Sequence, residues 1–168
     1  MRIARITVAG AAAAGMIASG AGLALASTST VQRPAASGTE HLSLMSTQPS
    51  ASKYVIIASG VFTAGGTDVS GNAIDVAKVT GGKFKINHGT NIHVISMKLN
   101  PKTCLEQFAA TAKFTLEGGT GAYKKLSGSG KALLTGIGIA PRSHGKCNPN
   151  ANPVVAEQTI TATAHVKL

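Results

Sequence analysis

The feature that most constrains the fold is an alternation of side-chain character with a period of two. From residue 154 to residue 168, mostly apolar residues alternate with mostly polar ones. Successive side chains of a β-strand point to opposite faces, so this pattern predicts a half-buried strand. Residues 104–117 alternate in the same way. Their apolar face consists of Phe108, Ala110, Ala112, Phe114 and Leu116.

Shorter alternating segments predict five further strands, at residues 53–64, 73–79, 83–88, 90–99 and 127–140. The Gly81-Gly82 pair predicts a tight hairpin, and a shift of the apolar positions predicts a bulge near Val94. No segment predicts a helix long enough for a parallel crossover. The sequence therefore predicts an all-β protein, a small antiparallel meander barrel of about seven to eight strands, with a β-sandwich as the alternative.

The N-terminus predicts export. Arg2 and Arg5 precede the uncharged, Ala- and Gly-rich residues 6–24, and Ala-Leu-Ala at 24–26 fits a signal peptidase site. The alternative is a retained membrane anchor, but the Ala/Gly-rich composition favours cleavage and leaves no stable anchor. Because the two arginines are not adjacent, the general secretory route is favoured over the twin-arginine route. Residues 1–26 are thus predicted to be a signal peptide.

Between the signal peptide and the barrel, residues 27–52 are rich in Ser, Thr, Ala, Gln and Pro. This composition predicts a flexible linker, which leaves residues 53–168 as the single folded domain. Pro34 and Pro49 argue against a long regular element in the linker. Three apolar residues within it either dock transiently or form a first edge strand: Leu42, Leu44 and Met45.

Cys104 and Cys147 are the only cysteines, and both lie in the predicted exported domain. An oxidising environment makes a disulfide bond between them the expected state. The alternative is a metal site formed by His144 and Cys147, but zinc needs about four ligands and the other cysteine is distant in sequence. We therefore expect a disulfide bond and no metal.

A glycine-rich segment at residues 114–130, FTLEGGTGAYKKLSGSG, connects two of the predicted strands. It resembles the strand, glycine turn and Gly-x-Gly of barrels related to allene oxide cyclase and dirigent proteins. It resembles more closely a group of small exported bacterial proteins of unassigned function. The resemblance implies a small antiparallel barrel. Separately, the glycines let the backbone reverse sharply after the strand that contains Phe114, so Tyr123 can cap one end of the barrel. No cyclase catalytic position can be matched to this chain.

Three polar residues fall on otherwise apolar strand faces: Tyr54, Glu106 and Gln158. No residue is assigned as catalytic, but Glu106 is the candidate, because a carboxylate on an apolar face can have a raised pKa and act as a general acid or base. The three could together line a ligand pocket. The alternatives are that Glu106 lies at the barrel rim and that Tyr54 and Gln158 form local hydrogen bonds.

The remaining polar residues give no recognisable site. The five histidines are scattered in sequence and are expected on the surface: His41, His88, His93, His144 and His165. Residues 68–72, DVSGN, have too few carboxylates for a calcium loop and predict a plain turn. Motifs for phosphate loops, zinc proteases and serine hydrolases are missing from the sequence, which predicts no cofactor.

The net charge of the mature chain is the last feature that bears on its function. Without Arg2 and Arg5 the mature chain has 14 basic and 6 acidic residues, a net charge of +8. Such a protein is expected to adsorb to anionic envelope polymers, whereas the scarcity of aromatic residues argues against specific nucleic-acid binding. The alternative is a diffusely basic, soluble surface.

The sequence thus favours a secreted or envelope-associated, non-enzymatic barrel that binds a small apolar ligand or an anionic cell-wall polymer. Two other functions stay open: an isomerase or cyclase-like enzyme that uses Glu106, and a structural or antigenic envelope protein.

Overall fold

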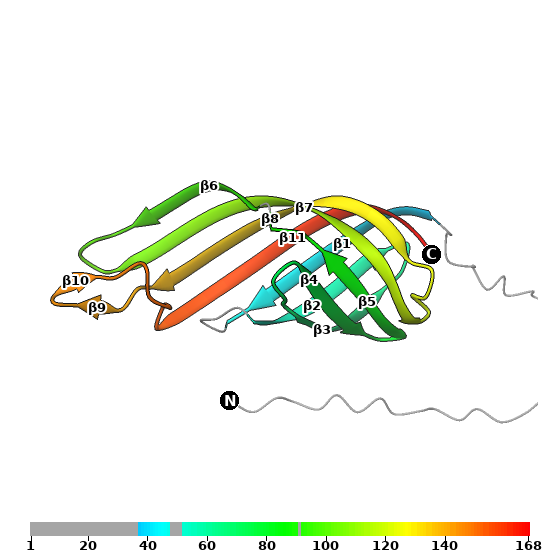
Figure 1. Ribbon diagram of the computed structural model, residues 1–168, viewed down its shortest axis with the longest axis horizontal. Helices are drawn as coiled ribbons and strands as arrows, with labels where there is room; N and C mark the ends of the chain where they lie inside the picture. The colour runs from blue at the N-terminus through cyan, green and yellow to red at the C-terminus, as the bar shows by residue number, and fades with distance from the viewer. Residues whose placement is uncertain (1–36, 48–51, 91) are drawn as a thin grey trace, which may run out of the picture. The chain divides into compact units, whose positions relative to one another are not determined.

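The fold is an eight-stranded antiparallel β-barrel (Figure 1). The computed structural model describes residues 37–47, 52–90 and 92–168, and every regular element within them is a β-strand. The prediction of a barrel is confirmed over the alternative of a sandwich. The barrel strands are β1 (Ser37–Ser46), β2 (Lys53–Gly60), β3 (Ala64–Val69), β4 (Ile74–Val79), β5 (Gly82–Asn87), β7 (Leu105–Gly121), β8 (Ser127–Ile139) and β11 (Val155–Lys167).

The strand order is that of a meander. Strands β1 to β5 pair consecutively, as do β7, β8 and β11, and two pairings close the barrel: β1 with β11, and β5 with β7. Strand β6 (Ile92–Leu99) lies outside the closed barrel and pairs with β7 alone. The bulge predicted near Val94 is confirmed, because the register of β6 against β7 shifts between Val94 and Ser96.

Strand β7 changes its partner part-way along its length. Residues 106–112 pair with β6, and residues 115–121 pair with β5. Lys113 and Phe114 lie between the two pairings, next to the connection from β5 to β6. The first half of β7 therefore extends past the closed barrel, as Figure 1 shows.

One end of the barrel is filled by aromatic side chains. The rings of Phe62, Phe84 and Tyr123 pack against one another with centroid separations of 5.0 to 5.9 Å. The Tyr123 hydroxyl donates a hydrogen bond of 2.8 Å to the Thr80 carbonyl in the hairpin between β4 and β5. That hairpin is as tight as predicted: Val79 pairs with Gly82, so only Thr80 and Gly81 form the turn. We call this the plugged end.

The prediction of a flexible linker over residues 27–52 is wrong for residues 37–46. These residues form β1, which pairs with β11 on one side and with β2 on the other. The strand alternates strictly, burying Glu40, Leu42, Leu44 and Ser46. The polar composition of this segment favoured a linker, although the segment forms a complete barrel strand. The predicted signal peptide and the remaining linker residues lie outside the described residues.

A second difference concerns residues 53–64, which were predicted to form one strand. The chain turns after Gly60 and starts β3 at Ala64, which pairs back onto β2. Strand β3 has the sequence AGGTDV, which lacks an apolar alternation because two glycines lie in its middle. This is the physical reason that the pattern did not predict it.

The disulfide bond between Cys104 and Cys147 is confirmed, with the two Cα atoms 5.3 Å apart. It joins the start of β7 to the long connection between β8 and β11. That connection, predicted to be a long loop, contains a small hairpin of β9 (Arg142–Ser143) and β10 (Lys146–Cys147). Arg142 donates one guanidinium hydrogen bond to the Gly145 carbonyl and another to the Lys102 carbonyl, which holds this hairpin against the turn before β7.

Candidate ligand cavity

A row of three alanines makes the interior of the barrel hollow. Ala112 of β7 pairs with Ala132 of β8, which pairs in turn with Ala162 of β11. All three side chains face inward and are only 8 to 9% exposed. An alanine methyl group extends only a short distance into the barrel, so the row leaves space inside. At the plugged end, larger side chains fill the interior.

This space is a cavity of about 220 Å³. Its wall is mainly apolar and includes Leu42, Leu44, Ile86, Phe114, Leu134 and Ile160. Binding sites for small molecules are typically concave and largely apolar, with a few placed polar groups. The barrel interior has the first two properties, and the polar groups gather at the end opposite the aromatic plug.

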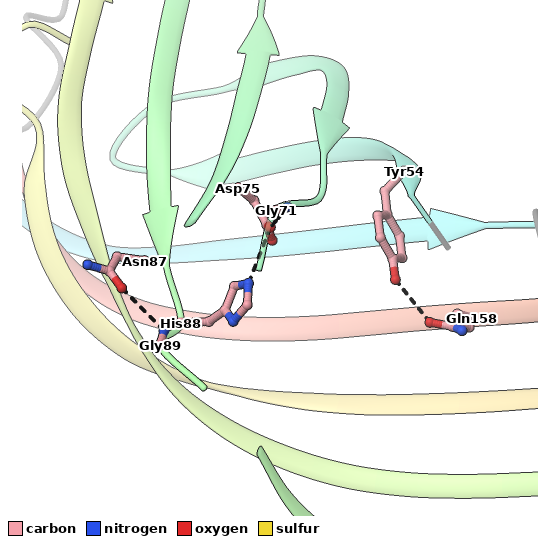
Figure 2. Close-up of polar contacts among 7 residues, drawn as sticks. All are labelled: Tyr54, Gly71, Asp75, Asn87, His88, Gly89 and Gln158. Carbon is pink, nitrogen blue, oxygen red and sulfur yellow. Dashed lines mark hydrogen bonds and ion pairs between the residues drawn. The ribbon is translucent and has the colours of Figure 1, made fainter. Parts of the chain in front are cut away.

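Two of the predicted site residues meet at this polar end. The Tyr54 hydroxyl, from the start of β2, donates a hydrogen bond of 2.9 Å to the Gln158 side-chain carbonyl, from the start of β11 (Figure 2). Both residues line the cavity. Burial raises the pKa of Tyr54 to about 12, and the negative charges of Asp75 and Asp68 act in the same direction. The hydroxyl therefore stays protonated and serves as a hydrogen-bond donor.

Asp75 and His88 form the second polar pair in the cavity wall. The Asp75 carboxylate accepts a 2.8 Å hydrogen bond from the Gly71 backbone and lies 3.2 Å from the His88 Nε2 atom (Figure 2). Asp75 faces inward from the start of β4, and His88 follows the end of β5. The other ring nitrogen of His88, Nδ1, is buried without a hydrogen-bond partner among the described residues.

Asp68 lies close to this polar end but does not itself line the cavity. It directly opposes Tyr54 in the β2–β3 ladder and is 0% exposed. Neither of its carboxylate oxygens has a hydrogen-bond partner within the described part of the chain. Burial and the nearby charge of Asp75 raise the pKa of Asp68 to about 7, although His88 acts against this rise. An unsatisfied buried carboxylate is costly, and its presence calls for an explanation.

Glu106 is not part of this site. It is partly exposed on the first half of β7, which pairs with β6 beyond the closed barrel, and it does not line the cavity. It lies six positions before Ala112, roughly 20 Å along an extended strand. The structure therefore brings together Tyr54 and Gln158 but leaves the third predicted residue elsewhere.

The inward positions of Asp68, Asp75 and His88 were not predicted from the sequence. A plain turn was expected at Asp68 and a surface position for His88, whereas Asp68 is buried in β3 and His88 lines the cavity. In β4 the apolar rule selects the wrong face, because Ile74 is exposed while Asp75 is buried. Asp75 and Ala77 are two positions apart and therefore share one face of β4, which was a signal for the inward face. It was not used, because an acidic residue is not expected inside a protein.

Comparison with family models, with curated proteins and with solved structures finds no match for this chain. Among the described residues, no three His, Cys, Asp or Glu side chains are grouped so that they could hold a metal ion. The same part of the chain contains no helix that is long and apolar enough to cross a membrane.

Proposed function

We propose that this protein is exported and that its barrel binds a small, largely apolar molecule in the cavity beside the alanine row. The observation that carries the proposal is an apolar cavity with one filled end and one polar end. A filled core would need no hydrogen-bonding groups inside it, yet Tyr54, Gln158, Asp75 and His88 all line this space. Such groups orient a ligand whose body is held by apolar contacts.

The size of the cavity limits the ligand. Sites for drug-sized molecules measure roughly 300 to 1,000 Å³, and this cavity measures about 220 Å³. A dry engineered cavity of about 150 Å³ accepts benzene. We therefore propose a ligand of about the size of a substituted benzene ring.

Export is supported by the predicted signal peptide and by the disulfide bond, which forms in oxidising compartments. The resemblance of residues 114–130 to allene oxide cyclase-like and dirigent-like barrels stays a prediction. Because Glu106 does not line the cavity, the geometry favours ligand binding over an enzyme that uses this carboxylate.

The experiment is to fill the cavity and measure the binding of toluene, a neutral probe of suitable size. Ala132→Leu adds three carbon atoms inside the alanine row. The matched control is Ala109→Leu, on β7 with its side chain on the opposite face from Ala110 and Ala112. A ligand that binds only the folded state raises the melting temperature.

We expect toluene to raise the melting temperature of the wild type and of Ala109→Leu, and to leave that of Ala132→Leu unchanged. Binding should weaken at least about tenfold in Ala132→Leu, which corresponds to about 1.4 kcal/mol. No toluene-dependent shift in the wild type, or equal shifts in both variants, would contradict the proposal.

A further inference from the structure

The outer face of the barrel is more basic than the composition alone indicates. Three of the 6 acidic residues, Glu40, Asp68 and Asp75, are buried, so their charges do not lie on the surface. Every lysine among the described residues is exposed. The surface therefore carries an excess of positive charge, which attracts anionic partners.

Two lysines face each other on the outside of the alanine row. Lys113 of β7 pairs directly with Lys131 of β8, next to the inward-facing pair of Ala112 and Ala132. Like charges that are directly opposite in a sheet destabilise it. Neither lysine forms an ion pair with a carboxylate in the described part of the chain. An anion bound between the two ammonium groups would offset their repulsion.

The lysine pair belongs to two adjacent rows of exposed polar side chains, which we call the basic hydroxyl face. None of the nine side chains is acidic or apolar: two are lysines, two are histidines and five carry a hydroxyl group. Strand pairing places them in one row of Lys113, Lys131, Thr163, His41 and Ser59 and a second row of Thr115, Ser129, His165 and Thr39.

The surface is hollowed beside the lysine pair. A shallow depression is lined by both lysines and by Thr115 and Ser129 of the second row. Ammonium and hydroxyl groups can each donate a hydrogen bond to an acidic oxygen. The next outward acidic residue along β7 is Glu117, which accepts a hydrogen bond of 2.9 Å from the Asn87 side chain. The depression can therefore hold an acidic group that the described residues do not supply.

The composition of the basic hydroxyl face indicates which class of anion fits it. The first row crosses five strands, roughly 19 Å, so it is longer than a single inorganic anion. The face has no aromatic side chain on which nucleic-acid bases could stack. It also has no apolar side chain that could insert into an anionic membrane. Its hydroxyl groups, in contrast, match the hydroxyl groups of a sugar chain.

We propose that the basic hydroxyl face binds an anionic polysaccharide, with one acidic group held between Lys113 and Lys131 and the sugar hydroxyls against the serine and threonine side chains. The site lies on the outer face of strands whose inner face lines the cavity. It is therefore separate from the proposed ligand site and does not depend on it.

The test measures the affinity of the full exported protein for polygalacturonate, a carboxylated polysaccharide, by isothermal titration calorimetry in about 0.1 M salt. In the double variant Lys113→Gln/Lys131→Gln we expect the affinity to fall about tenfold, because two exposed charge pairs are lost.

The matched control is Lys78→Gln/Lys83→Gln, which removes the same charge from another directly opposed lysine pair, on β4 and β5. Lys83 pairs with Thr120, which lies seven positions from Lys113 on β7, roughly 23 Å along the strand. At that distance the charges are largely screened, so the control should lose less than about threefold in affinity. Equal losses in the two double variants would show that only the net charge matters and would overturn the proposal.

Other probes test the class of the partner. At the same salt concentration, phosphatidylglycerol vesicles and single-stranded DNA should bind more weakly than polygalacturonate, and dextran, a neutral polysaccharide, should not bind. Tighter binding of the vesicles or the DNA would assign the face to a membrane or to nucleic acid and overturn the proposal, as would no binding of polygalacturonate. Toluene should bind both double variants as it binds the wild type, so a failure here leaves the proposed function intact.

Discussion

The two ends of the barrel have opposite construction. At the plugged end, the rings of Phe62, Phe84 and Tyr123 fill the interior. At the cavity end, inward-facing alanines leave a space of about 220 Å³. Two fully buried carboxylates also differ between the regions: Glu40 lies at the plugged end, and Asp68 lies opposite Tyr54 in the β2–β3 ladder.

The two carboxylates show what the difference means. The Glu40 carboxylate accepts a 3.1 Å hydrogen bond from the Phe62 backbone, so it connects β1 to the turn after β2. Burial raises the pKa of Glu40, but backbone hydrogen bonds from Phe62, Val61 and Ser59 lower it part of the way back. Within the described part of the chain, no backbone amide donates to Asp68. The two buried acids therefore differ in their partners: one oxygen of Glu40 accepts a backbone hydrogen bond, whereas neither oxygen of Asp68 has a partner among the described residues.

The largest expected effect comes from emptying the plugged end. Phe84 is completely buried in the aromatic cluster, so Phe84→Ala should lower the free energy of unfolding by about 3 to 5 kcal/mol. Phe114→Ala, which removes the same side chain from the wall of an existing cavity, should cost clearly less. Urea denaturation of both variants measures the difference. Equal losses would contradict the contrast between a filled and a hollow end.

The disulfide bond stabilises the side of the molecule beyond the cavity end. The bond closes a 43-residue separation, and its loss should lower the free energy of unfolding by about 4 kcal/mol on the chain-entropy model. Reduction should increase hydrogen exchange at residues 104–107 and 141–153 first. Exchange at Phe84 and Tyr123 should rise only with global unfolding. Early loss of protection at the plugged end would contradict this division.

The pH dependence of stability distinguishes the two carboxylates. In the folded protein Asp68 keeps its proton up to about pH 7, whereas in the unfolded chain it releases the proton near pH 3.8. Its contribution to stability is therefore complete below pH 3.8 and is lost as the pH rises to about 7, by about 1.4 kcal/mol for each pKa unit as an upper limit.

Measured as the free energy of unfolding from pH 4 to pH 8, the wild type should lose stability relative to Asp68→Asn. The Glu40→Gln variant, compared in the same way, should show a smaller change, because backbone donors hold the charged form of Glu40. A parallel pH profile for the wild type and Asp68→Asn would show that Asp68 ionises normally in the folded protein.

The smallest expected effect comes from removing one hydroxyl at each end. Tyr123→Phe removes the bond to the Thr80 carbonyl and should cost about 1 kcal/mol, because the carbonyl loses its partner. Tyr54→Phe removes the bond to Gln158 at the cavity end. We expect it to cost less, since Gln158 borders the cavity. Thermal melts of the two variants decide the order, and a larger loss for Tyr54→Phe would reverse it.

Much of the fold could be predicted from residues with a strict apolar alternation. Strands β7 and β11 are long and have one apolar face, so their period of two is evident without a structure. Strand β1 was predicted only as an alternative, an edge strand around Leu42, Leu44 and Met45, because serine, threonine and proline dominate the sequence around it. Its burial depends on β2 and β11, which pair with it from distant parts of the chain.

The site was predicted only where polar residues interrupt an apolar face. Tyr54 and Gln158 met that criterion, and barrel closure brings them together across a sequence separation of 104 residues. Asp75 and His88 did not, because their positions depend on which face of β4 and β5 turns inward. The pairing of β5 with β7, which closes the barrel, determines which face points inward, and no local sequence pattern predicts this pairing.

The most direct test of the hollow end is a titration of the protein with toluene, followed by NMR of ¹³C-labelled alanine methyl groups. We expect saturable shifts at Ala112, Ala132 and Ala162, which line the cavity. Ala64, at the plugged end, and Ala109, on the outer face, should not shift. Shifts spread evenly over the alanines, or no shift in the cavity row at saturating toluene, would contradict the claim that this end of the barrel holds a ligand.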